Sequence, residues 1–523
     1  MLEDTSKKII KNTIFNSAGF FWSYFLGFLL TPYIIHRIGI ERFGVWAIAN
    51  TAINFIIYFD LGISSSFVKY IAEYNAKKDY EMINKVINTG LAFSLFFCIS
   101  MSVLFLLSKN FFIGLLKFSP ELYGDVLFTF FGILTVFIIN YVFTVFKSIL
   151  HGLQRIDLTN MIFIIVSFPG TIGLVLFLSQ GYGLRGYVYN SVMVALVTVI
   201  SYAVCAYRVL PQIVIHPKFF SLEMLKKLWE FGFKVEISNY SEFINKQLDK
   251  ILLGYFLNLR MVAFYELGSK IALTVGTLPA VMLQSIEPAS SELDAENDTR
   301  ALNNLYTRGT KYIVFLAFPL SLFIIMNASS VMHFWMSGLG YEKSALTIQV
   351  LMIGYFFFLV NSVGRLVARG MGIPQFEMVS ALIILGLNIL LSVVLIIIFG
   401  FAGALIGTSM SAVIGSSFFM IRFHRHIKRT VTSFLKDVYL KPFFSCILAI
   451  LASSLIDFLL YFLDYSPSGR FGYFIYLSLK GIVFSGMYLF CIYITRHLDE
   501  YDKKVFLSAM KMPLSKLGFI KRV

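Results

Sequence analysis

The sequence has 523 residues, of which 58% are hydrophobic and only 14% charged, so it has too few polar side chains to cover a soluble globule. The net charge of +15 would suit nucleic acid, but the basic residues lie in short loops beside apolar segments, where they set membrane topology and contact anionic lipids. The composition therefore excludes a soluble globular protein and a nucleic-acid partner, and it predicts an integral membrane protein.

Fourteen apolar segments long enough to cross a bilayer follow one another along the chain. No segment alternates as a membrane β-barrel strand does, so the sequence predicts an all-α membrane protein with fourteen transmembrane helices. The even number places both chain ends on the same side. The predicted spans are 12–36, 43–65, 84–107, 126–150, 157–180, 184–208, 230–256, 262–286, 308–333, 345–370, 374–399, 401–424, 439–463 and 471–495.

The basic residues alternate along these segments. Of the 44 Lys and Arg, 32 lie in or beside alternate gaps and 9 in or beside the intervening gaps. Because basic loops are retained in the cytoplasm, this pattern places the N and C termini there. Only Lys246, Lys270 and Lys480 lie well inside a span.

The chain also shows signs of an internal repeat. The string Arg42–Ala47 opens the second span, and the similar string Arg260–Tyr265 opens the eighth, 218 residues later. Between the sixth and seventh spans, Ser221–Phe233 has the amphipathic pattern of an interfacial helix. We therefore expect two six-helix lobes around a central cavity. The predicted domains are an N-terminal lobe (1–210), an amphipathic cytoplasmic linker (211–229), a C-terminal lobe (230–425) and two additional spans with a basic tail (426–523).

Several strings resemble those of bacterial polysaccharide biosynthesis flippases of the Wzx type, in the superfamily that includes multidrug antiporters and the peptidoglycan-precursor flippase. The strings are Thr31–Gly39, Phe43–Ala47, Asp60–Ile63, Lys69–Tyr74, Asp249–Gly254, Phe264–Tyr265 and Glu287–Pro288. The resemblance implies translocation of an undecaprenyl-pyrophosphate-linked oligosaccharide, such as an O-antigen or capsule unit, across the bacterial cytoplasmic membrane by alternating access. It implies membrane lipids, glycosyltransferases and a polysaccharide polymerase as partners. By analogy, the two additional helices would contribute to a groove for the lipid tail.

Spans seven and eight each carry a polar stripe at mid-depth, where a charge facing lipid is costly. Glu242 and Lys246 are four residues apart, so such charges could simply neutralise one another. The alternative is a hydrated cavity in which Lys246 and Lys270 meet pyrophosphate or acidic sugars. The candidate residues of these two spans are Asn239, Glu242, Lys246, Asp249, Glu266 and Lys270.

Other polar residues have two interpretations each. Asn16 of span one and Asn50 and Asn54 of span two fit a cavity wall and equally fit helix packing. Arg365, Arg369 and Lys147, near the inner ends of spans, are expected to snorkel as topology anchors or to contact the pyrophosphate. Asp60 is expected to be a helix-end or gating group. Lys480 is expected to pair with Asp457 of the neighbouring span.

A peptidoglycan-precursor flippase on the same fold is one alternative, and two functions of other kinds also compete with the oligosaccharide flippase. A multidrug or cation antiporter would use acidic groups such as Glu242, Asp249 and Glu266. A membrane glycosyltransferase or polymerase would need a large loop with catalytic groups, whereas these loops are short and carry no metal cluster, nucleophile constellation or phosphate-binding loop. We therefore expect neither an enzyme nor a cofactor or metal, and coupling to sodium, protons or the membrane potential stays open.

Overall fold

The computed structural model describes residues 22, 25–58, 63–153, 155–277, 286–337, 340–500 and 502. These residues form helices joined by turns, with no strand among them, as the sequence predicts. Ten helical segments in this part of the chain are long and apolar enough to cross a membrane. They correspond to ten of the fourteen predicted spans, and a shorter apolar helix, Phe25–Ile38, falls at the first. The number fourteen and the side of the termini stay predictions.

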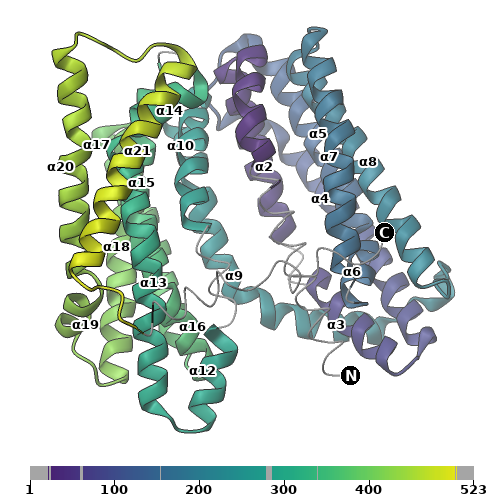
Figure 1. Ribbon diagram of the computed structural model, residues 1–523. Helices are drawn as coiled ribbons and strands as arrows, with labels where there is room; N and C mark the ends of the chain where they lie inside the picture. Colours follow the sequence, from purple (N-terminus) through teal and green to yellow (C-terminus); the bar gives the residue numbers. More distant parts are fainter. Residues whose placement is uncertain are drawn as a thin grey trace, which may run out of the picture. The chain divides into compact units, whose positions relative to one another are not determined.

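The chain divides into two compact units, which we call unit 1 (Met1–Ala263) and unit 2 (Phe264–Val523). Helix α10 (Leu259–Thr277) begins in unit 1 and lies mostly in unit 2. The helices of unit 1 are α2 (Ile40–Tyr58), α3 (Ile63–Ala76), α4 (Tyr80–Gly114), η1 (Pro120–Leu122), α5 (Tyr123–Val142), α6 (Thr144–Gly152), α7 (Ile156–Ser179), α8 (Gly183–Val209), η2 (Pro217–Phe219) and α9 (Leu222–Phe256) (Figure 1).

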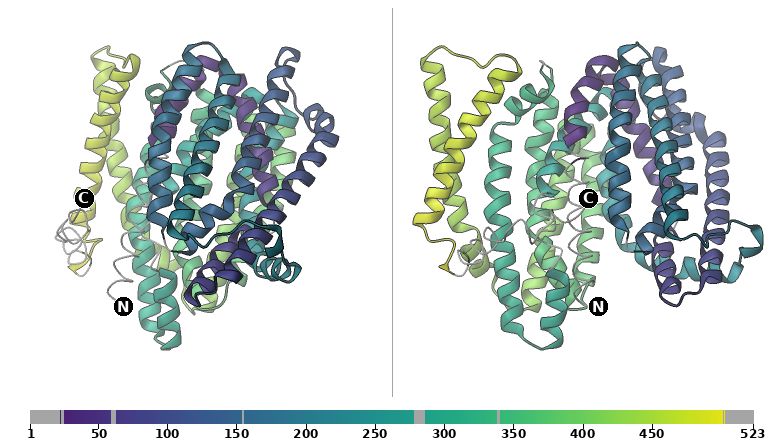
Figure 2. Two further views of the ribbon diagram at one scale, coloured as in Figure 1. Left: turned by 90° about the vertical axis from the view of Figure 1, so that its right-hand side faces the viewer. Right: turned by 45° about the vertical axis from the view of Figure 1, so that its right-hand side comes forward.

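Unit 2 repeats this order of helices and then extends it. Its last two helices, α20 and α21, form the yellow hairpin seen from two sides in Figure 2. The helices that follow α10 are α12 (Ile286–Ala295), α13 (Thr299–Met326), α14 (Ala328–Met336), α15 (Glu342–Val360), α16 (Ser362–Gly370), α17 (Gln375–Phe399), α18 (Phe401–His426), α19 (Val431–Val438), α20 (Leu440–Phe462) and α21 (Gly469–Ile494).

The helix bounds confirm the internal repeat. Six helices of unit 1, namely α2, α4, α5, α6, α7 and α8, begin 218 or 219 residues before α10, α13, α15, α16, α17 and α18. The turns agree as well, because Lys78 and Asn297 have φ values of 55° and 57°. The next residues, Asp79 and Asp298, cap α4 and α13 by accepting a backbone N–H with their side chains.

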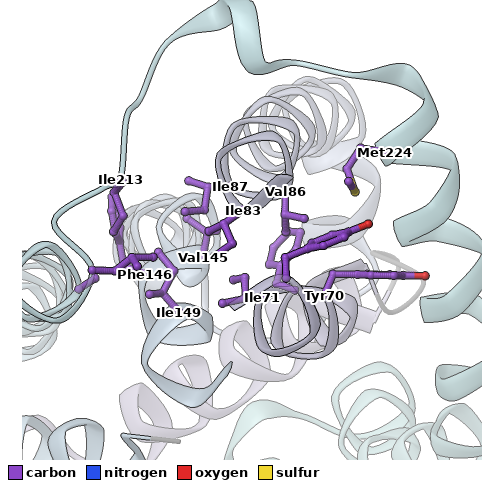
Figure 3. Packing of buried hydrophobic residues seen from close by; sticks show 14 of the residues in the cluster. Tyr70, Ile71, Ile83, Val86, Ile87, Val145, Phe146, Ile149, Ile213 and Met224 are labelled. Atoms are coloured by element: carbon purple, nitrogen blue, oxygen red, sulfur yellow. The ribbon is translucent and has the colours of Figure 1, made fainter. Parts of the chain in front are cut away.

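The boundary between the two units follows Ala263 and therefore lies further along the chain than the predicted linker at 211–229. Helix α9 packs within unit 1, where Ser66 Oγ donates to the Leu228 carbonyl (2.6 Å) and Lys117 Nζ to the Phe256 carbonyl (3.0 Å). Figure 3 shows Ile71 of α3, Ile83 of α4 and Val145 of α6 turned toward one another in the same core, which also includes Met224 and Leu228 of α9. Burial of these apolar side chains attaches α9 to unit 1.

The segment before α9 is attached to unit 1 by a pair of amides on α4. Asn84 donates to the Gln212 carbonyl (3.0 Å) and accepts the Val214 N–H (2.9 Å). Asn88 donates to the Val214 carbonyl (2.8 Å) and accepts the His216 N–H (2.9 Å). The two side chains thus satisfy an extended backbone as a neighbouring strand would.

Within the residues that the structure describes, three predicted spans are interrupted instead of continuous. The breaks lie at Phe143 between α5 and α6, at Asn327 between α13 and α14, and at Asn361 between α15 and α16. Asn327 and Asn361 each donate a side-chain N–H to the carbonyl four residues earlier, a local bond that competes with the continuing helix. Phe143 has no such side-chain bond.

Candidate functional site

Helix α10 presents a polar strip that is only partly enclosed. Glu266, Lys270 and Thr274 follow one another at four-residue spacing, and all three are half-buried. The opposite face packs on α15, where a Cβ at Gly268 would lie 2.4 Å from Thr347 Cβ. Ser344 Oγ of α15 donates to the Phe264 carbonyl (3.0 Å). This close contact turns the polar strip away from α15.

The strip carries both signs of charge. Glu266 and Lys270 lie one helical turn apart and interact electrostatically. Ser269, which immediately precedes Lys270, is buried, and its Oγ donates to the Glu266 carbonyl (3.2 Å). The open side of α10 can therefore bind a polar or ionic group through the amine of Lys270, the carboxylate of Glu266 and the hydroxyl of Thr274.

The predicted stripe on span seven falls on α9. Asp249 has no exposed surface, so it does not face an open cavity in this conformation, in contrast to the expectation for a cavity wall. Nearby on the same helix, Gln247 accepts a hydrogen bond from Thr51 Oγ1 of α2 (3.2 Å). The backbone of Asn239, Glu242 and Lys246 lies in α9, and their side chains lie outside the described part of the structure.

The predicted residues of span two lie on α2. Asn50 donates its side-chain N–H to the Trp46 carbonyl (2.9 Å), and the Trp46 ring stacks on Tyr187 of α8 with the ring centres 4.1 Å apart. Asn54 is half-buried. The Asn50 bond stays within α2, so both interpretations of Asn50 stay predictions. Asn16 and Asp60 lie outside the described residues.

Of the two arginines of span ten, one turns inward. Arg365, on α16, is 6% exposed, and its guanidinium donates to the Phe358 carbonyl and lies over the Phe358 ring. It binds a carbonyl that the helix break leaves available, so it is not the snorkelling side chain that the sequence predicts. Arg369 forms two hydrogen bonds with Glu377 of α17, at 2.6 and 2.8 Å, and is half-exposed.

Lys147 lies on α6, after the break at Phe143. Its side chain is exposed, and within the described part of the chain its ammonium has no hydrogen bond or ion pair. One turn later, His151 shares a hydrogen bond of 3.2 Å with Thr159 of α7.

The predicted pair in the last two helices is confirmed. Lys480 Nζ lies 2.8 and 3.1 Å from the two carboxylate oxygens of Asp457, and it also donates to Tyr476 OH (3.1 Å). Tyr476 in turn donates to Asp457 (2.6 Å). Lys480 is therefore satisfied within the α20–α21 hairpin.

Unit 2 contains an apolar groove of about 680 Å³ between α13 and α15 on one side and α19 and α20 on the other. The sequence analysis missed α19, although Val431, Phe434, Leu435 and Val438 have helical spacing and could have indicated it. The groove is lined by Phe318, Ser321, Leu322, Ile325, Ile353, Phe356, Phe357, Val360, Asn361, Met420, Thr432, Leu435, Lys436, Tyr439, Leu440 and Phe443.

A second feature missed by the sequence analysis is a charged cluster beyond α21, which we call the Asp502 cluster. The buried Asp502 carboxylate accepts hydrogen bonds of 2.6 Å from each of Arg308, Lys311 and Tyr312, all on α13. These bonds hold the pKa of Asp502 below its usual value despite burial. No group of three or more potential metal ligands occurs in the described residues.

Comparison with known proteins gives consistent results. Residues 9–294 match the family described as "Polysaccharide biosynthesis protein", and residues 237–394 match the family described as "MatE". A putative O-antigen transporter of Shigella flexneri is 24% identical over 357 residues, which are 67% of this chain and 82% of the transporter. A probable flippase of Haloferax volcanii, AglR, is 21% identical over 399 residues, which are 75% of this chain and 78% of the flippase.

A solved structure shares the fold. The lipid II flippase MurJ in an inward closed conformation has a TM-score of 0.70 with this chain, over 92% of this chain and 98% of the flippase. The two sequences are 17% identical, so the likeness establishes the helical transporter fold alone.

Proposed function

This chain belongs to the polysaccharide biosynthesis protein family, and from this premise we propose that it is a flippase for an undecaprenyl-pyrophosphate-linked oligosaccharide. It is a multi-pass membrane protein, and translocation would cross the cytoplasmic membrane by alternating access. The observation that carries the proposal is the family match over residues 9–294, which is more than half of the chain.

Unit 2 offers two surfaces suited to the two parts of such a substrate. The strip of Glu266, Lys270 and Thr274 can exchange hydrogen bonds with a sugar or phosphate headgroup, and an amine is a compact charge that releases what it binds. The apolar groove of unit 2 can shelter part of a polyprenyl chain, because nearly all of its lining is hydrocarbon. An amphipathic lipid needs both kinds of surface.

A multidrug or cation antiporter is the second candidate, favoured by the "MatE" match over residues 237–394. Such a transporter would place acidic groups in its binding pocket, whereas Asp249 is enclosed and Glu266 has a cation one turn away. Energy coupling to sodium, protons or the membrane potential, and partnership with a glycosyltransferase and a polymerase of the same pathway, are part of the proposal.

The deciding experiment is transport by the purified full chain in proteoliposomes. We expect a labelled lipid-linked oligosaccharide to become accessible in the opposite leaflet, and we expect no uptake of a cationic dye. Dye uptake without lipid translocation would establish the antiporter instead. Imposing a sodium, proton or potential gradient one at a time identifies the coupling.

The role of the α10 strip is tested by Lys270→Ala. We expect a large loss of translocation at unchanged protein level, with partial recovery in Lys270→Arg because the positive charge is kept. Lys343→Ala, which removes an exposed lysine at the start of α15, is the matched control. Full translocation by Lys270→Ala would leave only a structural role for the strip.

A further inference from the structure

The repeat places two basic residues at matching positions after each helix break. Lys147 and His151 of α6 correspond to Arg365 and Arg369 of α16, each 218 residues later. In both copies the pair begins four residues after the break, at Phe143 in unit 1 and at Asn361 in unit 2. The two copies can therefore be compared position by position.

One of the two contacts is preserved between the copies. Arg369 bonds to Glu377 in unit 2, and the corresponding residues of unit 1, His151 and Thr159, share a hydrogen bond of 3.2 Å. Each bond joins the short helix to the first turn of the next long helix. This contact is therefore structural in both units.

The other contact is made in unit 2 only. Arg365 reaches back across the break to the Phe358 carbonyl and is buried there. The residue of unit 1 at the position of Phe358 is Asn140, which is exposed, as Lys147 is. Asn140 donates its side-chain N–H to the Val136 carbonyl, and the described residues show no hydrogen bond between Asn140 and Lys147. In the part of the chain that the structure describes, Lys147 therefore makes no contact in unit 1 of the kind that Arg365 makes in unit 2.

The location of Lys147 makes its exposure costly unless its ammonium meets water or an anion. The residue lies five positions before Gly152, where the candidate span Pro120–Gly152 ends, which is about 7 Å along a helix. At this depth an ammonium group needs water, a lipid phosphate or a bound anion as its partner. The geometry of unit 2 indicates that a side chain at this position reaches residue 140, so an anion beside Asn140 is within range.

We propose that Lys147 and Asn140 form a binding site for the phosphate groups of the lipid-linked substrate near one end of the α5–α6 span. The inference rests on the proposed function and deepens it, because it assigns the phosphate part of the substrate to unit 1. Arg365, at the equivalent position, has no part in this site and serves the fold of unit 2. Membrane phospholipids also carry phosphate esters, so the test must distinguish the phosphate of the substrate from the phosphate of an ordinary lipid headgroup.

The test measures binding to the full chain in nanodiscs of phosphatidylcholine, with geranylgeranyl diphosphate as the probe and geranylgeraniol as its phosphate-free counterpart. We expect wild-type protein to prefer the diphosphate, and Lys147→Ala to weaken diphosphate binding about tenfold or more, as expected for loss of a charged hydrogen bond. Binding of geranylgeraniol should not change. Lys147→Arg should restore the preference.

Two further variants control for general effects. Lys77→Ala removes an exposed unit 1 lysine that pairs with Glu73, and it should leave the affinity for the diphosphate unchanged. Arg365→Gln should lower the melting temperature while a folded fraction keeps the diphosphate preference. A melting curve of Lys147→Ala that matches wild type assigns the affinity loss to the ligand.

Three outcomes would overturn the inference. If Lys147→Ala binds the diphosphate as wild type does while wild type translocates lipid-linked oligosaccharide, the site is wrong and the flippase function stands. If discs containing phosphatidylglycerol abolish the diphosphate preference, Lys147 is a contact to ordinary membrane lipid. If wild type shows neither diphosphate preference nor translocation, both the site and the proposed function fail.

Discussion

Helices α6 and α16 hold equivalent places in the two halves of the chain, yet α6 carries an exposed amine where α16 carries a buried guanidinium. The backbone break before each helix is the same, so it belongs to the repeated architecture. What differs is the use of the charge. Arg365 stabilises the broken helix, whereas Lys147 is left available to a ligand. Lys147 and Arg365 therefore have different roles, although the alternation of basic residues along the chain does not distinguish them.

The two units also differ at their ends. Unit 2 continues into α19, α20 and α21, and the chain then returns to α13 through the Asp502 cluster. No equivalent extension follows α8 in unit 1, where the chain enters the segment bound by Asn84 and Asn88. The added helices pack on α13 through apolar side chains, and the segment after α21 is secured to α13 by charges. The linker of unit 1 is secured by neutral amides instead.

The largest effect is expected where the extension of unit 2 is secured. Asp502→Ala leaves Lys311 and Arg308 without their buried partner, which should cost about 3 kcal/mol of stability. The apparent melting temperature of the full chain in detergent measures this loss. Asp499→Ala, at a half-exposed carboxylate bound to the same Arg308, should cost much less. Equal melting temperatures for the two variants would show that the cluster does not secure the extension.

The same region should make stability depend on pH. Burial, with Lys311 and Lys441 nearby, lowers the pKa of His497 to about 4, against an ordinary value of 6.5, although Asp502 acts in the opposite direction. Below pH 6.5 the unfolded chain binds a proton that the folded chain does not, so stability should fall as the pH drops from 6.5 to 4, by up to about 3 kcal/mol. Asp502 keeps its contribution through this range because its own pKa is lowered.

The pH effect is measured from melting temperatures over this interval in wild type and in His497→Gln. The variant should show a flatter dependence, since glutamine does not titrate. An identical slope in both proteins would assign the pH dependence to other groups.

Gly152 and Gly370 occupy matching positions of the repeat, so substitutions at these glycines compare the packing of the two units. A Cβ at Gly370 would lie 2.7 Å from the Glu287 carbonyl oxygen and closer still to Ser290, whereas a Cβ at Gly152 would lie 2.9 Å from Ile71 Cγ2 and 3.1 Å from the Val68 carbonyl oxygen. We expect Gly370→Ala to cost about 1 to 3 kcal/mol because the added Cβ overlaps a backbone oxygen, and Gly152→Ala to cost less because its nearest contacts are wider. Melting temperatures of the two variants test this order, and the reverse order would refute the comparison.

The smallest effect concerns the preserved contact between short and long helices. Glu377→Gln removes a half-exposed ion pair with Arg369 and should cost less than about 1 kcal/mol, with a smaller loss at high salt. Thr159→Val removes the neutral bond to His151, and its effect should not depend on salt. Melting temperatures at low and high salt separate the two, and equal salt dependence would contradict the assignment of the bonds.

Much of the helix plan follows from the sequence because apolar length and turn chemistry are local properties. Ten predicted spans coincide with helices, and the weak likeness between Arg42–Ala47 and Arg260–Tyr265 marks a repeat that the helix bounds confirm. Lys480 and Asp457 could be paired in advance because a single hairpin joins their helices. The helix breaks were not predicted, because the hydrophobicity of a segment does not distinguish a continuous helix from one that is interrupted for a single turn.

The candidate site was less predictable for a physical reason. Helical spacing places Asp249 on a polar face, but whether that face is enclosed depends on α9 packing within unit 1. Glu266 and Lys270 were correctly placed on one strip because they lie a turn apart on one helix. Ser269 immediately precedes Lys270, yet packing buries it.

The sequence by itself determined that this chain is a helical membrane protein of two related halves, because hydrophobic length, basic loops and repeated strings are carried by neighbouring residues. The tertiary structure decided which charged side chains bind partners within the protein. Arg365 turns inward to a carbonyl, Asp502 returns to α13, and Lys147 stays exposed. Those outcomes depend on partners distant along the chain or on the direction of one side chain, and only packing supplies that information.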